Sequence, residues 1–95
     1  MQPEEIDLYE AIRQMKKLSS QKKSFSFVHS TWDSERMISN GFRNVEHAAI
    51  RSAARGDELV NADFKLFYYD EDLRAPRTCW QMLILFFNNK KVVLN

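Results

Sequence analysis

The sequence predicts an α+β domain in which an N-terminal helix packs on a curled antiparallel sheet or small barrel of about five strands, built from two hairpin units. Apolar residues first repeat with helical spacing and then, from residue 24, alternate with a period of two. Asn-Gly and Asn-Asn pairs separate the alternating segments. The 95 residues are enough for a single domain, with an amphipathic helical region over 1–18 and an antiparallel β region over 24–94.

The first segment is predicted to form a helix over residues 3–18. Pro3 suits the first helical position, where its missing N–H is not needed. Charge is segregated along this segment, since residues 1–10 contain four acids and no bases, and residues 11–23 contain five bases and no acids. The apolar stripe follows i, i+3, i+4, i+7 spacing and consists of Leu8, Ala11, Ile12 and Met15.

The next segment is predicted to form a hairpin. Apolar and polar residues alternate from Ser24 to Trp32, which indicates a strand. Asn40-Gly41 is a strong hairpin signal and predicts a second strand from Phe42 to Ile50 that pairs back onto the first. A helix over residues 44–55 is the competing interpretation, because alanines favour it and Gly56 could terminate it. The Asn-Gly pair favours the strand.

The C-terminal half is predicted to contain a strand over Phe64–Tyr69 and a charged connection over Asp70–Pro76. The following segment, Thr78–Phe87, is apolar on both faces, which is typical of a central strand covered on both sides. We expect the helix to cover one side and a second layer or a neighbouring subunit to cover the other. Asn88-Asn89 then predicts a turn into a final strand, Lys90–Leu94, at an edge of the sheet.

The composition excludes several classes of site. One cysteine cannot form an internal disulfide or a cysteine-rich zinc site. The two glycines, Gly41 and Gly56, are too far apart for a dinucleotide-binding or P-loop motif. The net charge of +1 provides no overall attraction to nucleic acid or membrane, and the longest apolar run, Met82–Phe87, is too short to span a bilayer. We therefore expect no catalytic residues, no cofactor, no metal and no membrane partner.

The cellular location is expected to be the cytoplasm. A lone cysteine fits a reducing compartment. The first residues, Met1–Asp7, are acidic and lack the apolar segment of a signal peptide.

The histidines are the most plausible chemical groups in the sequence. A turn at Asn40-Gly41 would bring His29 and His47 near each other, and with Cys79 or an acid they could form a zinc or general-base site. No two of these residues have the short spacing of a metal signature, so two separate strand histidines are favoured. The acidic triplet Asp70–Asp72 lacks the pattern of a calcium loop and is interpreted as a solvated turn.

We expect a non-enzymatic module that works by self-association or by docking another protein, because the apolar central strand needs a second cover. The candidate interface consists of Trp80, Leu83, Ile84, Leu85, Phe86, Phe87 and Val92. The alternative is a module for single-stranded nucleic acid, in which basic side chains contact phosphates while Phe25 and Phe27 stack on bases. Its candidate phosphate contacts are Arg13, Lys16, Lys17, Lys22 and Lys23.

Several features follow a charged helical start in a fixed order across residues 24–94. They are Phe25-Ser26-Phe27, Gly41 at the second strand, Asp70 and Asp72 followed by Arg77, and the terminal hairpin Phe87–Leu94. This order resembles short uncharacterised proteins encoded in prophages and conjugative elements of gut bacteria. The resemblance implies a mobile-element accessory or virion-associated component, and it transfers no activity and no functional residue.

Overall fold

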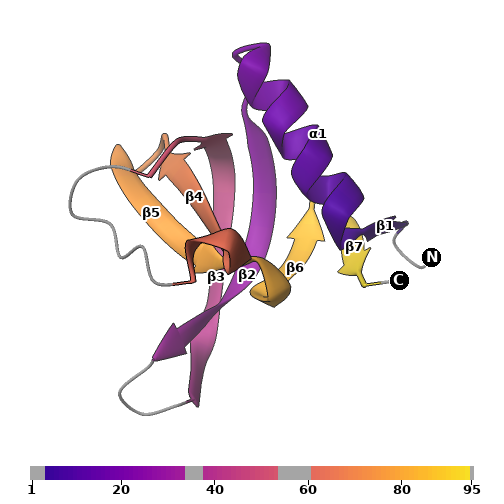
Figure 1. Ribbon diagram of the computed structural model, residues 1–95, viewed down its shortest axis with the longest axis vertical. Coiled ribbons are helices and arrows are strands. Elements are labelled where there is room, and N and C mark those ends of the chain that lie inside the picture. The colour runs from indigo at the N-terminus through magenta and orange to yellow at the C-terminus, as the bar shows by residue number, and fades with distance from the viewer. Residues whose placement is uncertain (1–3, 34–37, 54–60, 95) are drawn as a thin grey trace.

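The computed structural model describes residues 4–33, 38–53 and 61–94 and has two layers, a helix and one mixed sheet (Figure 1). The helix α1 (Leu8–Ser20) lies against one face of the sheet, which confirms the α+β class. Within the described residues the strands are β1 (Glu5–Asp7), β2 (Phe25–Asp33), β3 (Ile38–Ile50), β4 (Lys65–Asp70), β5 (Ala75–Trp80), β6 (Ile84–Phe87) and β7 (Lys90–Val93).

The sheet is larger than predicted and is not a barrel. Its seven strands lie in the order β1-β7-β6-β2-β3-β4-β5, and the two ends of this order do not pair with each other. Three antiparallel hairpins, β2–β3, β4–β5 and β6–β7, account for most of the pairing, and β1 adds parallel to β7. The predicted barrel or sheet of about five strands is therefore wrong, because Glu5–Asp7 form an additional strand and the segment predicted as one strand over Thr78–Phe87 contributes to two, β5 and β6.

The helix begins later than the predicted residue 3. Glu5–Asp7 form β1, whose middle residue Ile6 is buried in the core. Asp7 then caps the helix, because its carboxylate accepts hydrogen bonds from the backbone N–H groups of Tyr9 (3.0 Å) and Glu10 (3.3 Å). The predicted apolar stripe is the buried side of α1 and consists of Leu8, Ala11, Ile12 and Met15.

The β2–β3 hairpin confirms the strand interpretation and not the helix for the described part of residues 44–55. The strand, β3, ends at Ile50. The predicted turn at Asn40-Gly41 is wrong, because both residues lie inside β3. β2 runs on to Asp33, which pairs with Ile38, so the two strands stay paired beyond Asn40-Gly41. The register of the hairpin therefore differs from the one that a turn at Asn40-Gly41 would give, and Phe27 pairs with Val45.

The apolar segment Thr78–Phe87 is not one central strand, as predicted. β5 ends at Trp80, a short 3-10 helix η2 (Gln81–Leu83) follows, and β6 starts only at Ile84. The Gln81 amide explains the break, because it donates to the backbone carbonyls of Asp63 (3.3 Å), within the 3-10 helix η1 (Ala62–Phe64), and Lys65 (3.0 Å). β2 is the central strand instead, and β5 lies at an edge.

The predicted edge position of the final strand is also wrong. β7 pairs with β6 on one side and with β1 on the other, so its backbone is not open to a second copy. The turn before it is confirmed, since Asn88 and Asn89 both have positive φ, at 46° and 68°.

The core lies between α1 and the sheet face that we call the inner face. Its centre is a group of aromatic rings, with the ring of Phe27 in edge contact with Tyr68, 4.9 Å between centroids, and tilted against Phe25 at 5.7 Å. The ring of Phe87 adds to this group at 5.9 Å from Phe25. The opposite face of the sheet, which we call the outer face, lies on the side away from α1.

Candidate functional site

The structure separates the two histidines. His29 is buried on the inner face, whereas His47 is exposed on the outer face. His29 pairs with Arg43, and His47 lies four residues further along β3, beyond a bulge that turns it to the other face. Cys79 is buried as well, and burial raises the pKa of its thiol to about 12. The two histidines and Cys79 therefore form no common site.

His29 belongs to a satisfied pair in the core. Its Nδ1 lies 3.1 Å from the Ser30 carbonyl oxygen, which can only accept, so Nδ1 carries the proton. Its Nε2, 3.0 Å from the Tyr68 hydroxyl, then accepts from that hydroxyl. Burial lowers the pKa of His29, and the nearby charge of Arg43 lowers it further, against the opposing bond to Ser30. Burial also raises the pKa of Tyr68 to about 12, so both groups are neutral.

A bulge in β3 places two neighbouring side chains on the outer face. In a regular strand residues 45 and 48 would point to opposite faces, but Val45 and Ala48 are both buried. The register shifts between these positions, because Phe27 pairs with Val45 and Phe25 pairs with Ala48. The two residues between them, Glu46 and His47, therefore face solvent side by side.

The β4–β5 turn brings a third side chain to the same place. The buried carboxylate of Asp70 accepts from the backbone N–H groups of Asp72 (3.1 Å) and Leu73 (3.2 Å) and so shapes the turn. The Glu71 N–H donates to the His47 carbonyl oxygen at 2.9 Å, which ties the turn to the bulge. Asp72 is thereby held beside the His47 ring. Glu71 and Asp72 lie in an exposed turn, as interpreted, but Asp70 is the last residue of β4 and is buried, so the interpretation is wrong for Asp70.

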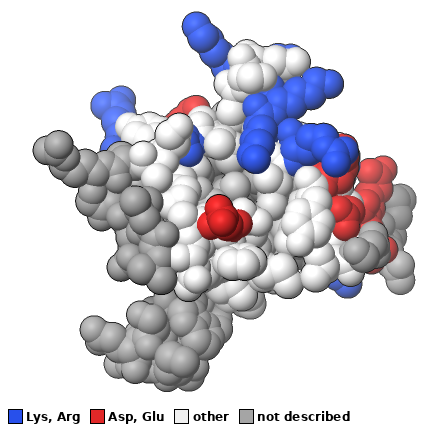
Figure 2. Space-filling view, in the orientation of Figure 1, with Lys and Arg blue, Asp and Glu red and all other residues white. Residues whose placement is uncertain are grey.

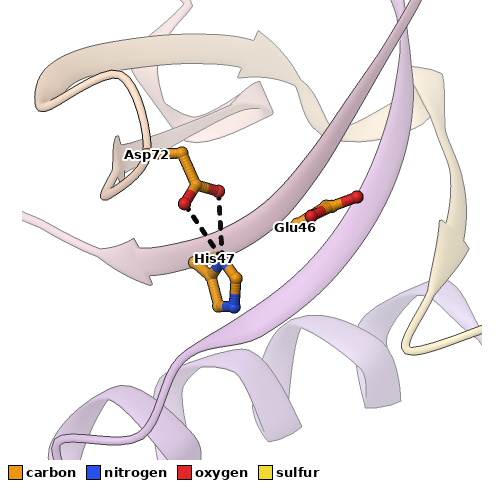
Figure 3. Close-up of side chains that lie close together, drawn as sticks. All are labelled: Glu46, His47 and Asp72. Carbon is orange, nitrogen blue, oxygen red and sulfur yellow. Dashed lines mark hydrogen bonds and ion pairs between the residues drawn. The ribbon is translucent and has the colours of Figure 1, made fainter.

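Glu46, His47 and Asp72 form a compact cluster (Figure 3). The Asp72 carboxylate points at the His47 ring, with its two oxygens 3.0 and 3.1 Å from Nδ1. One ligand atom from each of the three residues lies within 4.8 Å of the others. The bond to Asp72 and its charge raise the pKa of His47, and the carboxylates of Glu46 and Glu71 act in the same direction. An imidazole and carboxylates at this spacing can hold a proton or a cation.

Sequence reasoning named His47 but missed its partners. Glu46 was not singled out, and Asp72 lies 25 residues from His47 along the chain. One signal was present, because apolar Val45 and Ala48 are an odd number of residues apart and so break the period of two. No comparable signal pointed from the bulge to the β4–β5 turn.

The five predicted phosphate contacts are all exposed. Figure 2 shows Lys and Arg side chains over the C-terminal half of α1 and acidic side chains nearer its start. Arg13 also pairs with Glu10 one turn earlier. The stacking part of this prediction is wrong, because Phe25 and Phe27 are buried in the core. The exposed group consists of Arg13, Lys16, Lys17, Lys22 and Lys23.

The candidate interface residues divide into two sets. Ile84 and Phe87 are buried in the core and Val92 packs against it, so Ile84 and Phe87 are not open to a partner. Phe86 is 38% exposed, and Met82, which the prediction did not include, is 58% exposed. The half-buried members are Trp80, Leu83 and Leu85.

Comparison with protein-family models, with curated proteins and with solved structures found no match to this chain. Within residues 4–33, 38–53 and 61–94, no helix combines the length and the apolar character that are needed to span a bilayer.

Proposed function

We propose that the protein is a non-enzymatic interaction module that associates with a second copy of itself. One observation carries the proposal: five apolar side chains within seven consecutive residues are not fully buried in the monomer. The break at η2 produces this exposure, because it interrupts the alternation that would otherwise turn every second side chain inward. We call this set the 80–86 surface, and its members are Trp80, Met82, Leu83, Leu85 and Phe86.

A second copy is the occupant that fits this surface. In a two-fold dimer the same apolar patch meets itself, so no separate complementary surface is required. The net charge of +1 means that two copies repel each other little. The sheet edges are less suited to pairing, because β1 has three residues and β5 contains Pro76, which lacks an N–H donor. Such a dimer fits the mobile-element accessory role that the resemblance implies.

The double substitution Met82→Asp and Phe86→Asp is expected to convert a dimer into a monomer. The added carboxylates would have to be buried without partners at the interface. Sedimentation equilibrium at micromolar concentration measures the mass of each form. The matched control is Tyr9→Asp, since Tyr9 is as exposed (59%) as Met82 but lies on α1, and this variant should remain dimeric. A monodisperse wild-type monomer would contradict the proposal.

A second candidate function is binding of single-stranded nucleic acid through the basic side chains of α1 and the segment after it. The observation that favours it is that all five bases of this stretch are exposed, and Figure 2 shows Lys and Arg side chains gathered over the C-terminal half of α1. Lysines near a helix C-terminus also stabilise the helix, so clustering alone does not distinguish the two roles. Binding in this case is electrostatic, because the predicted stacking aromatics are in the core.

If all five bases contact phosphates, the affinity for a single-stranded oligonucleotide should fall with a log–log salt slope of about −3.5. A fourfold increase in salt then weakens binding about a hundredfold. Fluorescence anisotropy with a labelled oligonucleotide measures this slope. The substitutions Lys16→Gln and Lys17→Gln should make the slope shallower, whereas Lys90→Gln and Lys91→Gln on β7 should not. Absence of binding at low salt removes this candidate.

A further inference from the structure

We propose that Glu46, His47 and Asp72 bind one divalent transition-metal ion, such as Zn²⁺, on the outer face of the sheet. This site goes beyond self-association and uses none of the residues of the 80–86 surface. Its three side chains come from the β3 bulge and the β4–β5 turn (Figure 3). Both elements are held by backbone and carboxylate hydrogen bonds, so the side chains start from fixed backbone positions.

The spacing of the donor atoms suits a single ion. Donors around Zn²⁺ lie about 2.0–2.2 Å from the metal, which places neighbouring donors roughly 3–3.5 Å from each other. Nδ1 of His47 and the nearer Asp72 oxygen are 3.0 Å apart, so an ion can replace the proton between them with little movement. The Glu46 carboxylate lies within 4.8 Å of both, and its exposed side chain can close the remaining distance.

The donor types select the class of metal. An imidazole nitrogen with two carboxylates is a ligand set for Zn²⁺ and other first-row transition ions, whereas Mg²⁺ and Ca²⁺ prefer oxygen donors throughout. All three side chains are exposed, so water can occupy the remaining positions. Glu71, beside the cluster, contributes negative charge without being one of the three ligands.

Isothermal titration of the folded protein with Zn²⁺ tests the site. We expect one ion per chain, an affinity for Zn²⁺ well above that for Mg²⁺, and a loss of at least about tenfold in His47→Ala. The matched control is Glu71→Gln, which removes one nearby charge but no ligand, and it should reduce the affinity much less than Glu46→Gln. Circular dichroism of each variant confirms that it is folded.

Several different outcomes of these measurements would contradict the metal site. Absence of Zn²⁺ binding in the wild type would overturn the proposal, as would equal binding of Zn²⁺ and Mg²⁺. An equal loss in Glu71→Gln and Glu46→Gln would show diffuse attraction of a cation instead of coordination. A stoichiometry of half an ion per chain would show that two copies share the ion, which would overturn a site within one chain. In NMR spectra, Zn²⁺ should shift the imidazole signals of His47 and leave those of buried His29 unchanged.

Discussion

Replacing Phe27 with alanine is expected to lower the free energy of unfolding by about 3–5 kcal/mol. Phe27 is 1% exposed and lies on β2, the central strand of the sheet. Its ring stacks on His29 at 5.3 Å and contacts Tyr68 edge-on at 4.9 Å. Truncation removes these contacts and leaves a cavity that a strand paired on both sides cannot close. Urea unfolding followed by circular dichroism measures the loss.

The matched control for this substitution is Phe42→Ala. Phe42 is also an aromatic residue of the β2–β3 hairpin, but it is 75% exposed on the outer face. Its replacement should change the free energy of unfolding by no more than about 0.5 kcal/mol. Similar losses in the two variants would mean that the inner face of β2 is not the centre of the core.

Replacing Tyr68 with phenylalanine is expected to lower the free energy of unfolding by about 1–3 kcal/mol. The ring is retained, so packing changes little, but Nε2 of buried His29 loses its hydrogen-bond donor. The double variant His29→Leu, Tyr68→Phe should recover part of this loss, because it removes both polar groups together. Urea unfolding at pH 8, where His29 is neutral in both states, isolates the effect. A loss in Tyr68→Phe below about 0.5 kcal/mol would contradict it.

The pH dependence of unfolding provides an independent check on this pair. Burial lowers the pKa of His29 below 6.5 in the folded state, so only the unfolded chain takes up the proton as the pH first falls below 6.5. The contribution of His29 to stability is thus present above pH 6.5 and is lost as the pH falls toward its folded pKa. The pKa of His47 is raised, so its contribution to stability changes with pH in the opposite direction. Unfolding is therefore measured as a function of pH in the His47→Ala variant, where this contribution is absent. Adding His29→Leu to that variant should remove the part of the pH dependence that His29 contributes.

Local spacing was sufficient to predict several elements correctly. The apolar stripe of α1, the alternation in β2 and the turn at Asn88-Asn89 depend on residues close together in the chain. The preference for strand over helix in β3 was also correct, although the Asn40-Gly41 turn that favoured it lies inside the strand. An Asn-Gly pair forms a turn only where the two flanking strands end. Here β2 continues to Asp33 and stays paired with β3 beyond Asn40-Gly41.

Other features depended on segments far apart in the sequence. β1 forms because β7 offers it a parallel partner about 85 residues later. The apolar run Thr78–Phe87 breaks because the Gln81 amide reaches backbone carbonyls 16 and 18 residues earlier. Neither contact has a local signature, so a helix that starts too early and one long central strand were the natural interpretations of these segments.

The surface groups also divide into those that local sequence predicts and those that depend on contacts between distant segments. Charge along the chain was enough to predict the exposed bases near the end of α1, because each lies at a polar position of one helix or the segment after it. The composition also identified the apolar run that supplies the 80–86 surface. Which of its side chains are buried, and the meeting of Glu46 and His47 with Asp72, required the three-dimensional arrangement. The physical reason is that strand register and a single bulge decide which face a side chain occupies, and both are set by pairing with distant segments.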